Sequence, residues 1–179
     1  MRNNQPVTQR EKSLPESQRL ISTTDVKGQI TYCNEAFIEI SGFSRDELIR
    51  APHNLVRHPD VPSAVFAHTW NTLKGGKPWM GIVKNRCKNG DHYWVNAYVT
   101  PILENRQVVG YESVRVKPTR EQLQRAEALY ARINAGKAAI PATDNLIPVL
   151  QDWLPFILIS QIGFMVGASL VLSLMRQGH

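Results

Sequence analysis

The sequence predicts an α+β domain on a five-stranded antiparallel sheet with short helices, followed by a C-terminal helix and one transmembrane helix. Three observations support this fold class. Two apparent strands precede a run of short helices and three further strands, an order typical of antiparallel α+β domains. The tripeptide Asn89-Gly90-Asp91 lies between apolar runs, a strong β-hairpin signal. Finally, residues 154–175 carry no charge over a length that can cross a bilayer.

The first two strands are expected over residues 19–25 and 29–33. The segment RLISTTD is rich in β-branched residues, and QITYC follows it after a short polar break. Asp25 and Gly28 bound that break, and both residue types favour turns. The two strands therefore form a predicted hairpin.

Short helices are expected next, because three start and stop signals follow one another. Asn34 is placed as an N-cap, and Gly42 is placed to end the first helix with a positive φ. Ser44 and Glu47 have the spacing of a capping box, which starts a second helix through Ile49. Pro52 stops this second helix.

The segment PHNLVRHPDVP, residues 52–62, is either a surface loop stiffened by prolines or the wall of a binding site.

A helix is expected over residues 61–73, ending at Gly75-Gly76. Three strands are then expected, joined by Asn89-Gly90-Asp91 and by Glu104-Asn105-Arg106. These strands comprise residues 79–88, 92–103 and 108–117.

Four segments lie outside the α+β domain, which is expected over residues 19–118. Residues 1–18 are interpreted as a polar, mobile cap, since they lack the apolar region of a secretory signal. A Thr119 to Gln122 capping box opens an amphipathic connecting helix over residues 119–136. Residues 137–153 are read as a linker, and residues 154–175 as the membrane helix, flanked by Trp153 and Arg176.

Composition limits the classes of function. The net charge is +6, but the lysines and arginines are scattered and no aromatic motif for stacking bases accompanies them, so a nucleic-acid partner is not expected. The two cysteines, Cys33 and Cys87, have no metal-binding spacing. Neither a nucleophile-base constellation nor a phosphate-binding loop is present, which argues against an enzyme.

Several motifs in this order resemble the PAS domain. They are Tyr32-Cys33-Asn34, the residues Phe37, Ser41-Gly42-Phe43 and Glu47-Leu48, then Lys88-Asn89-Gly90 and Tyr93-Trp94. The uninterrupted run PHNLVRHPD is more specific, and with Pro78-Trp79, VKNR at 83–86 and NGDHYWV at 89–95 it is similar to the aerotaxis-receptor family. These receptors are the energy-taxis transducers of bacteria.

The resemblance implies a PAS pocket that binds FAD non-covalently and follows the redox state of respiration. It implies signalling to chemotaxis proteins through output domains absent from this chain, and a homodimeric receptor. With the absent signal peptide and a weak positive charge bias before the span, it favours the inner membrane, with the PAS domain in the cytoplasm.

Candidate cofactor residues come first from the 52–62 segment. Arg57 and His58 can donate hydrogen bonds to an anion, and Asp60 can orient either of them or bond a ribose hydroxyl. A surface ion pair between Arg57 and Asp60 is the alternative. We expect Arg57→Ala or Asp60→Ala to lose bound flavin while the fold survives.

Other candidates rest on the resemblance and on residue type. Flavin photoreceptor PAS domains have one amide side chain at the position of Asn85 and a second at the position of Val95. Because valine replaces this second amide, Asn34 or Asn96 is expected to assist Asn85 at the flavin edge. Trp79 and Phe66 are candidates for packing on the flavin ring, although aromatic side chains often serve the core alone.

Light-driven adduct formation is not expected, because it needs a cysteine near Asn54, whereas Cys33 and Cys87 lie on expected strands. Two alternatives remain beside an FAD-bound redox sensor. A haem gas sensor would use the helical His68. A cofactor-free PAS module that dimerises and relays a signal is the second.

Overall fold

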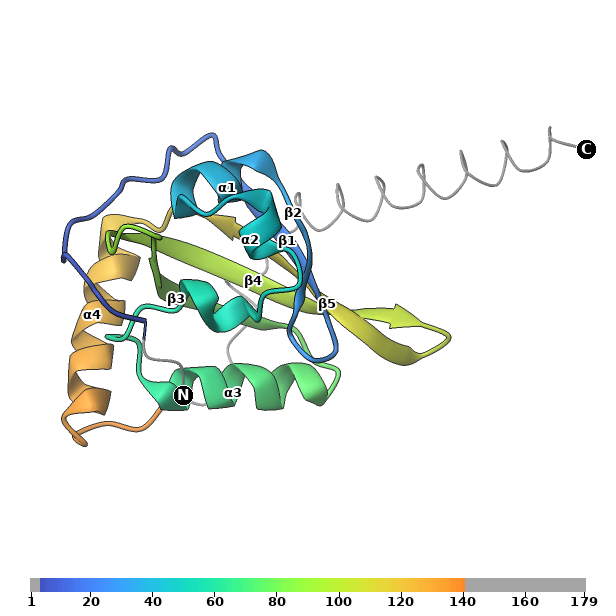
Figure 1. Ribbon diagram of the computed structural model, residues 1–179. Helices are drawn as coiled ribbons and strands as arrows, with labels where there is room; N and C mark the ends of the chain where they lie inside the picture. The colour runs from blue at the N-terminus through green and yellow to red at the C-terminus, as the bar shows by residue number, and fades with distance from the viewer. Residues whose placement is uncertain (1–3, 141–179) are drawn as a thin grey trace, which may run out of the picture. The chain divides into compact units, whose positions relative to one another are not determined.

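The computed structural model describes residues 4–140, which contain one five-stranded antiparallel sheet in the order β2-β1-β5-β4-β3 (Figure 1). The elements in chain order are β1 Leu20–Asp25, β2 Ile30–Cys33, α1 Glu35–Ser41, α2 Arg45–Leu48, the 3₁₀ helix η1 His53–Val56, α3 Ser63–Lys74, β3 Trp79–Arg86, β4 His92–Glu104, β5 Gln107–Val116 and α4 Arg120–Asn134. The α+β prediction and the five-stranded sheet are confirmed.

The expected β-hairpins are present. At the β1–β2 turn the Asp25 carboxylate accepts from the backbone N–H groups of Lys27 (2.8 Å) and Gln29 (2.9 Å). Gly28 follows with a φ of 79°, which a residue with a Cβ adopts at a cost. Gly90 plays the same part between β3 and β4, with a φ of 95°. Local turn chemistry therefore fixes both of these connections.

The helix caps also form as predicted. Asn34 accepts from the Phe37 N–H at the start of α1, and Gly42 ends that helix with a φ of 72°. Both capping boxes are complete, from Ser44 to Glu47 at α2 and from Thr119 to Gln122 at α4. Each box satisfies backbone donors that a helix start leaves free.

The expectation of a mobile N-terminal cap is wrong. The backbone of residues 8–12 hydrogen-bonds to the β3–β4 turn and to the start of β4, from the Thr8 N–H to the Gly90 carbonyl (3.0 Å) and from the Lys12 N–H to the His92 carbonyl (2.7 Å). Leu14 is buried in the core. Free backbone groups at that end of the sheet gain partners in this way, so a polar composition did not imply mobility.

The two faces of the sheet carry different helices. Side chains alternate across a strand, and Trp94 of β4 stacks on Tyr130 of α4 with centroids 6.3 Å apart, so α4 covers one face. Helix α3 contacts β3 and β4 (Figure 1). It lies on the other face, towards which Val95 and Ala97 point. The space between α3 and the sheet holds the candidate site.

No helix within residues 4–140 has the length and apolar character needed to cross a membrane. The predicted membrane helix, residues 154–175, lies outside the described residues, as does most of the linker predicted over residues 137–153.

Candidate functional site

A cavity of about 210 Å³ lies between the sheet, η1 and α3. Most of its wall is apolar, formed by Val56, Val65, Phe66, Trp70, Leu73, Trp79, Val83, Val95, Ala97, Val99 and Tyr111. Polar side chains converge on it from the strands and from the segment after α2: Ser22, Thr24, His53, Asn54, Arg57, Asn85, Ser113 and Arg115. An apolar cavity with a few convergent polar groups is the usual form of a small-molecule site.

The strand register explains why the polar groups from β1 and β5 meet. Ser22 pairs with Ser113 across β1 and β5, and Leu20 pairs with Arg115 one step along the same face. On the other side of β5, Arg115 pairs with Ala97 of β4. Because alternate residues share a face, Ser113 and Arg115 both point into the cavity beside the small Ala97.

Arg115 is the most deeply buried charged side chain of the wall, with 2% of its surface exposed. Its Nη2 donates to the Ser22 hydroxyl (2.8 Å) and lies 2.6 Å from His53 Nε2. The guanidinium also lies over the Phe37 ring, 4.9 Å from the centroid. Burial lowers the pKa of Arg115 to about 10, still well above neutral pH. It therefore stays charged inside the fold.

Positive charge predominates in the cavity wall. Lys27, Arg57 and Arg115 contribute cationic side chains, and no aspartate or glutamate lines the cavity among residues 4–140. Lys27 is exposed on the β1–β2 turn, whereas Arg57 is buried. The wall therefore suits a ligand with a large apolar surface and negatively charged or electron-rich groups.

Arg57 is held at the edge of the sheet. Its backbone forms an isolated antiparallel bridge with Asn85 of β3, which also lines the cavity and is 3% exposed. The Asn4 side chain donates to the Arg57 carbonyl at 2.8 Å. The Arg57 guanidinium donates to the Val61 carbonyl (2.5 Å) and lies over the Phe66 ring at 5.2 Å. Both cofactor candidates Arg57 and Asn85 thus reach the same cavity.

Trp79 forms a second aromatic wall beside Phe66. Its indole N–H donates to His68 Nδ1 of α3 at 3.3 Å, which ties β3 to α3. A Cβ at Gly81 would come within 2.5 Å of the Trp79 ring, so this ring lies across the glycine. The small residue at position 81 therefore lets Trp79 lie against its own strand.

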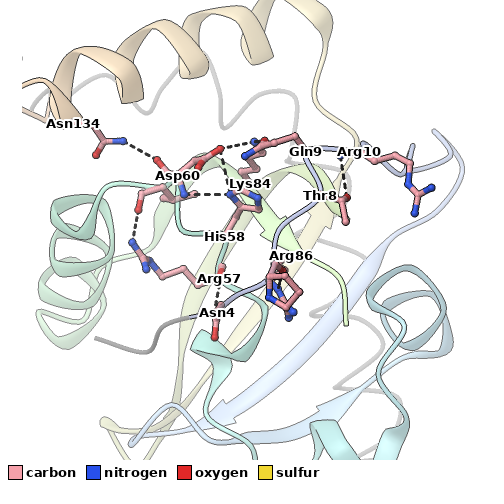
Figure 2. A network of polar contacts seen from close by, with 12 residues as sticks. Asn4, Thr8, Gln9, Arg10, Arg57, His58, Asp60, Lys84, Arg86 and Asn134 are labelled. Atoms are coloured by element: carbon pink, nitrogen blue, oxygen red, sulfur yellow. Dashed lines mark hydrogen bonds and ion pairs between the residues drawn. The ribbon is translucent and has the colours of Figure 1, made fainter. Parts of the chain in front are cut away.

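His58 and Asp60 belong to a polar network outside the cavity (Figure 2). The Asp60 carboxylate lies 2.7 Å from Lys84 Nζ, and the Asp60 N–H donates to His58 Nδ1 at 3.2 Å. The Asn134 amide of α4 donates to the Asp60 carbonyl at 3.0 Å. This network joins the 52–62 segment to β3 and α4, and neither His58 nor Asp60 lines the cavity.

Asn34 also lies apart from the cavity. Its side chain accepts from the Ile21 N–H (3.0 Å) and the Phe37 N–H (3.2 Å), and it donates to the Arg19 carbonyl (2.8 Å). These bonds fasten α1 to β1, so its side chain is committed to the backbone.

The structure thus places Arg57, Phe66, Trp79 and Asn85 at one cavity, and leaves Asn34, His58 and Asp60 outside it. Sequence reasoning missed Arg115, the most buried charge of the wall. The available signal was the alternation of Tyr111, Ser113 and Arg115 on the last strand, which puts an arginine on the same face as a large aromatic residue.

Residues relevant to the alternative chemistries also lie elsewhere. Cys33 and Cys87 are buried free thiols that do not line the cavity, and neither lies near Asn54 in the sequence, where adduct chemistry was expected to need a thiol. His68 does not line the cavity either, and its Nδ1 is engaged by Trp79. The described wall therefore offers neither an adduct-forming thiol nor the helical histidine as a haem ligand.

Comparison with known proteins agrees with the observed fold. Residues 30–115 match the PAS fold family. The aerotaxis receptor of Escherichia coli (strain K12) is 46% identical over 148 residues, which cover 83% of this chain and 29% of that protein. A nitrogen fixation regulatory protein of Klebsiella pneumoniae is 29% identical over 76% of this chain and 29% of its own length. The chain thus spans less than a third of the length of these relatives.

Solved structures share the fold at low sequence identity. The dark structure of the blue-light photoreceptor Aureochrome1 LOV aligns with a TM-score of 0.55 and 18% identity, over 65% of this chain and 86% of that one. The PAS domain of a Colwellia psychrerythraea protein aligns with a TM-score of 0.52 and 24% identity, over 57% and 87% of the two chains. At these identities the comparison establishes the fold alone.

Proposed function

Residues 30–115 of this chain belong to the PAS family, and from this premise we propose that the chain is a redox sensor whose cavity binds FAD non-covalently. The observation that most directly supports this proposal is a largely apolar cavity whose wall has three cationic side chains and no carboxylate among the described residues. A flavin ring needs apolar walls, and the diphosphate of FAD needs positive charge.

The size of the cavity limits which part of FAD it holds. Its volume of about 210 Å³ is below the range of roughly 300–1,000 Å³ typical of whole small-molecule sites. We assign the cavity to the flavin ring, with the diphosphate and the adenine end extending outward. Lys27, which is exposed at the rim, and Arg57 are the cations proposed to meet the diphosphate.

The proposed roles of the remaining residues follow from their positions. Phe66 and Trp79 pack against the ring and exclude water, and Asn85 hydrogen-bonds its polar edge. His58 and Asp60 hold the segment that carries Arg57, so we propose that they position this residue without contacting the cofactor. When bound, the flavin supplies reversible electron uptake.

A change in the bound ring is proposed to reach α4 through β3. Asn85 lies on β3 in the cavity, and the same strand offers the Ile82 carbonyl to the Tyr130 hydroxyl of α4. By similarity to the aerotaxis receptor, we further propose an inner-membrane homodimer that signals to chemotaxis proteins from the cytoplasmic side.

One spectrum of the purified full chain tests the proposal. We expect flavin absorbance bands that bleach on reduction, and heating should release FAD, identified by chromatography against FMN and riboflavin. A spectrum dominated by a Soret band would replace the proposal with a haem sensor. A colourless, folded protein that takes up no added FAD would favour the cofactor-free signalling module.

A further inference from the structure

Arg115 is a buried cation whose charge no described residue balances. Among the described residues, its guanidinium contacts the Ser22 hydroxyl, the His53 ring and the Phe37 ring. Its Nη1 has no hydrogen-bond partner within residues 4–140, and no ion pair formed among those residues includes it. Burying an unpaired charge is costly, so such an arrangement is unusual unless a ligand completes it.

The neighbours of Arg115 leave the inner part of the cavity positive at neutral pH. His53 accepts at Nε2 from Arg115 Nη2, which requires an unprotonated nitrogen, and burial together with the Arg115 charge lowers the pKa of His53 to about 3. Burial raises the pKa of the Tyr93 phenol, which therefore stays neutral. Neither group supplies the missing negative charge.

The geometry of the guanidinium leaves one terminal nitrogen, Nη1, without a partner among the described residues. Ser22 and His53 both engage Nη2, while Phe37 lies against the guanidinium plane. The fork of donors in arginine is rigid, so fixing Nη2 also fixes Nη1. The side chain is thus oriented by neutral groups, lines the cavity, and keeps Nη1 without a partner among the described residues.

We propose that Arg115 is the charge partner of the bound flavin ring and raises its reduction potential, an inference that rests on the proposed function. A flavin ring that takes up two electrons and one proton carries one more negative charge than the oxidised ring. A fixed cation in a buried site stabilises this reduced form more than the oxidised form. Arg115 therefore sets the redox range over which the sensor responds.

The test is the midpoint potential of the flavin in the full chain, measured by spectroscopic titration. Arg115→Gln should shift the equilibrium towards the oxidised form at least tenfold, a fall of about 30 mV for a two-electron couple. Arg115→Lys keeps the charge and should restore most of the potential. Arg125→Gln removes the same charge from an exposed position on α4 and should leave the potential at the parent value.

A second variant answers the question if Arg115→Gln fails to fold. Ser22→Asp retains the buried guanidinium but supplies a carboxylate where the Ser22 hydroxyl now accepts from it. The potential should fall in the same direction, because the charge of Arg115 is then balanced within the protein. A carboxylate in the cavity wall lowers the potential by itself, so Thr24→Asp, on the same strand and in the same wall, is the reference. A merely structural Arg115 would change the melting temperature, and Ser22→Asp would then lower the potential no more than Thr24→Asp does.

The two possible failures are distinguishable. A folded parent protein that binds no flavin overturns the proposed function and this inference with it. Bound flavin with the same potential in the parent and in every folded variant among Arg115→Gln and Ser22→Asp overturns the inference alone.

Discussion

At the residue scale, Arg57 and Asp60 are close in sequence but differ in surroundings. Arg57 lines the cavity, whereas the Asp60 carboxylate faces Lys84 outside it. We expect Arg57→Ala to lower flavin affinity directly and, because its guanidinium donates to the Val61 carbonyl, to lower the free energy of unfolding of the flavin-free protein by about 1–2 kcal/mol. Asp60→Ala should reduce that free energy by about 1–2 kcal/mol, less than for a fully buried pair because Asp60 is half-exposed. Any loss of flavin from Asp60→Ala would then follow from the weakened fold.

Flavin titration and urea unfolding of the same preparations separate these effects. Asn71→Ala, on the exposed surface of α3, provides a control that should change neither quantity. If Asp60→Ala loses flavin without any loss of stability, the carboxylate contacts the cofactor directly and our placement of it is wrong.

The same contrast shows what the sequence could predict about the site. Local composition identified the 52–62 segment, and one of its three candidates, Arg57, lines the cavity. Which charges point inward depends on long-range pairing, such as the bridge between Arg57 and Asn85. Arg115 was missed for the same reason, because its burial follows from the register of β5 with β1 and β4 and not from neighbouring residues.

At the element scale, predictions succeeded where a few adjacent residues decide the structure. The capping boxes and the turn at Asn89-Gly90 are local signals, and the helices and hairpins formed accordingly. The helix η1 was not predicted, since a 3₁₀ turn between prolines has no periodic apolar pattern. The docked N-terminal segment was missed because its bonds are made by backbone groups, which composition does not reveal.

Helix α4 is attached to the sheet by a small number of specific contacts. The Tyr130 hydroxyl donates to the Ile82 carbonyl, and the Tyr130 ring stacks on Trp94. We expect Tyr130→Phe to keep the stacking but lose the hydrogen bond, which costs about 1 kcal/mol. Amide hydrogen exchange along residues 120–134 should then become several-fold faster.

Tyr32→Phe is the matched control, since this tyrosine is half-exposed on β2 and far from α4 in the sheet order. In Tyr32→Phe, amide hydrogen exchange in α4 should keep the rate of the parent protein. Equal rates in the parent and in Tyr130→Phe would mean that the hydroxyl bond contributes nothing to the docking of α4. The proposed route from β3 to this helix would then lose its main contact.

At the scale of the whole domain, histidines with lowered pKa values make stability depend on pH. Burial and the Arg115 charge lower the pKa of His53 to about 3, and burial and the Lys84 charge lower the pKa of His58 to about 4. Unfolded histidine has a pKa near 6.5, so the unfolded state binds more protons between that value and about 4. The contribution of the two neutral histidines to the free energy of unfolding is complete above pH 6.5 and is lost as the pH falls through this window.

Urea unfolding of the full chain, followed by tryptophan fluorescence, should therefore show a falling stability from pH 7 to pH 5. The expected loss is up to about 2 kcal/mol for each histidine. Asp60 and Asp91 act at lower pH, because hydrogen bonds from Lys84 and Thr8, respectively, hold their carboxyl pKa values below the usual 3.8. His53→Gln and His58→Gln should each flatten the pH profile, since glutamine keeps an acceptor but takes up no proton. A profile that is flat between pH 7 and pH 5 in the parent would contradict the assignment of both rings as neutral groups in the folded state.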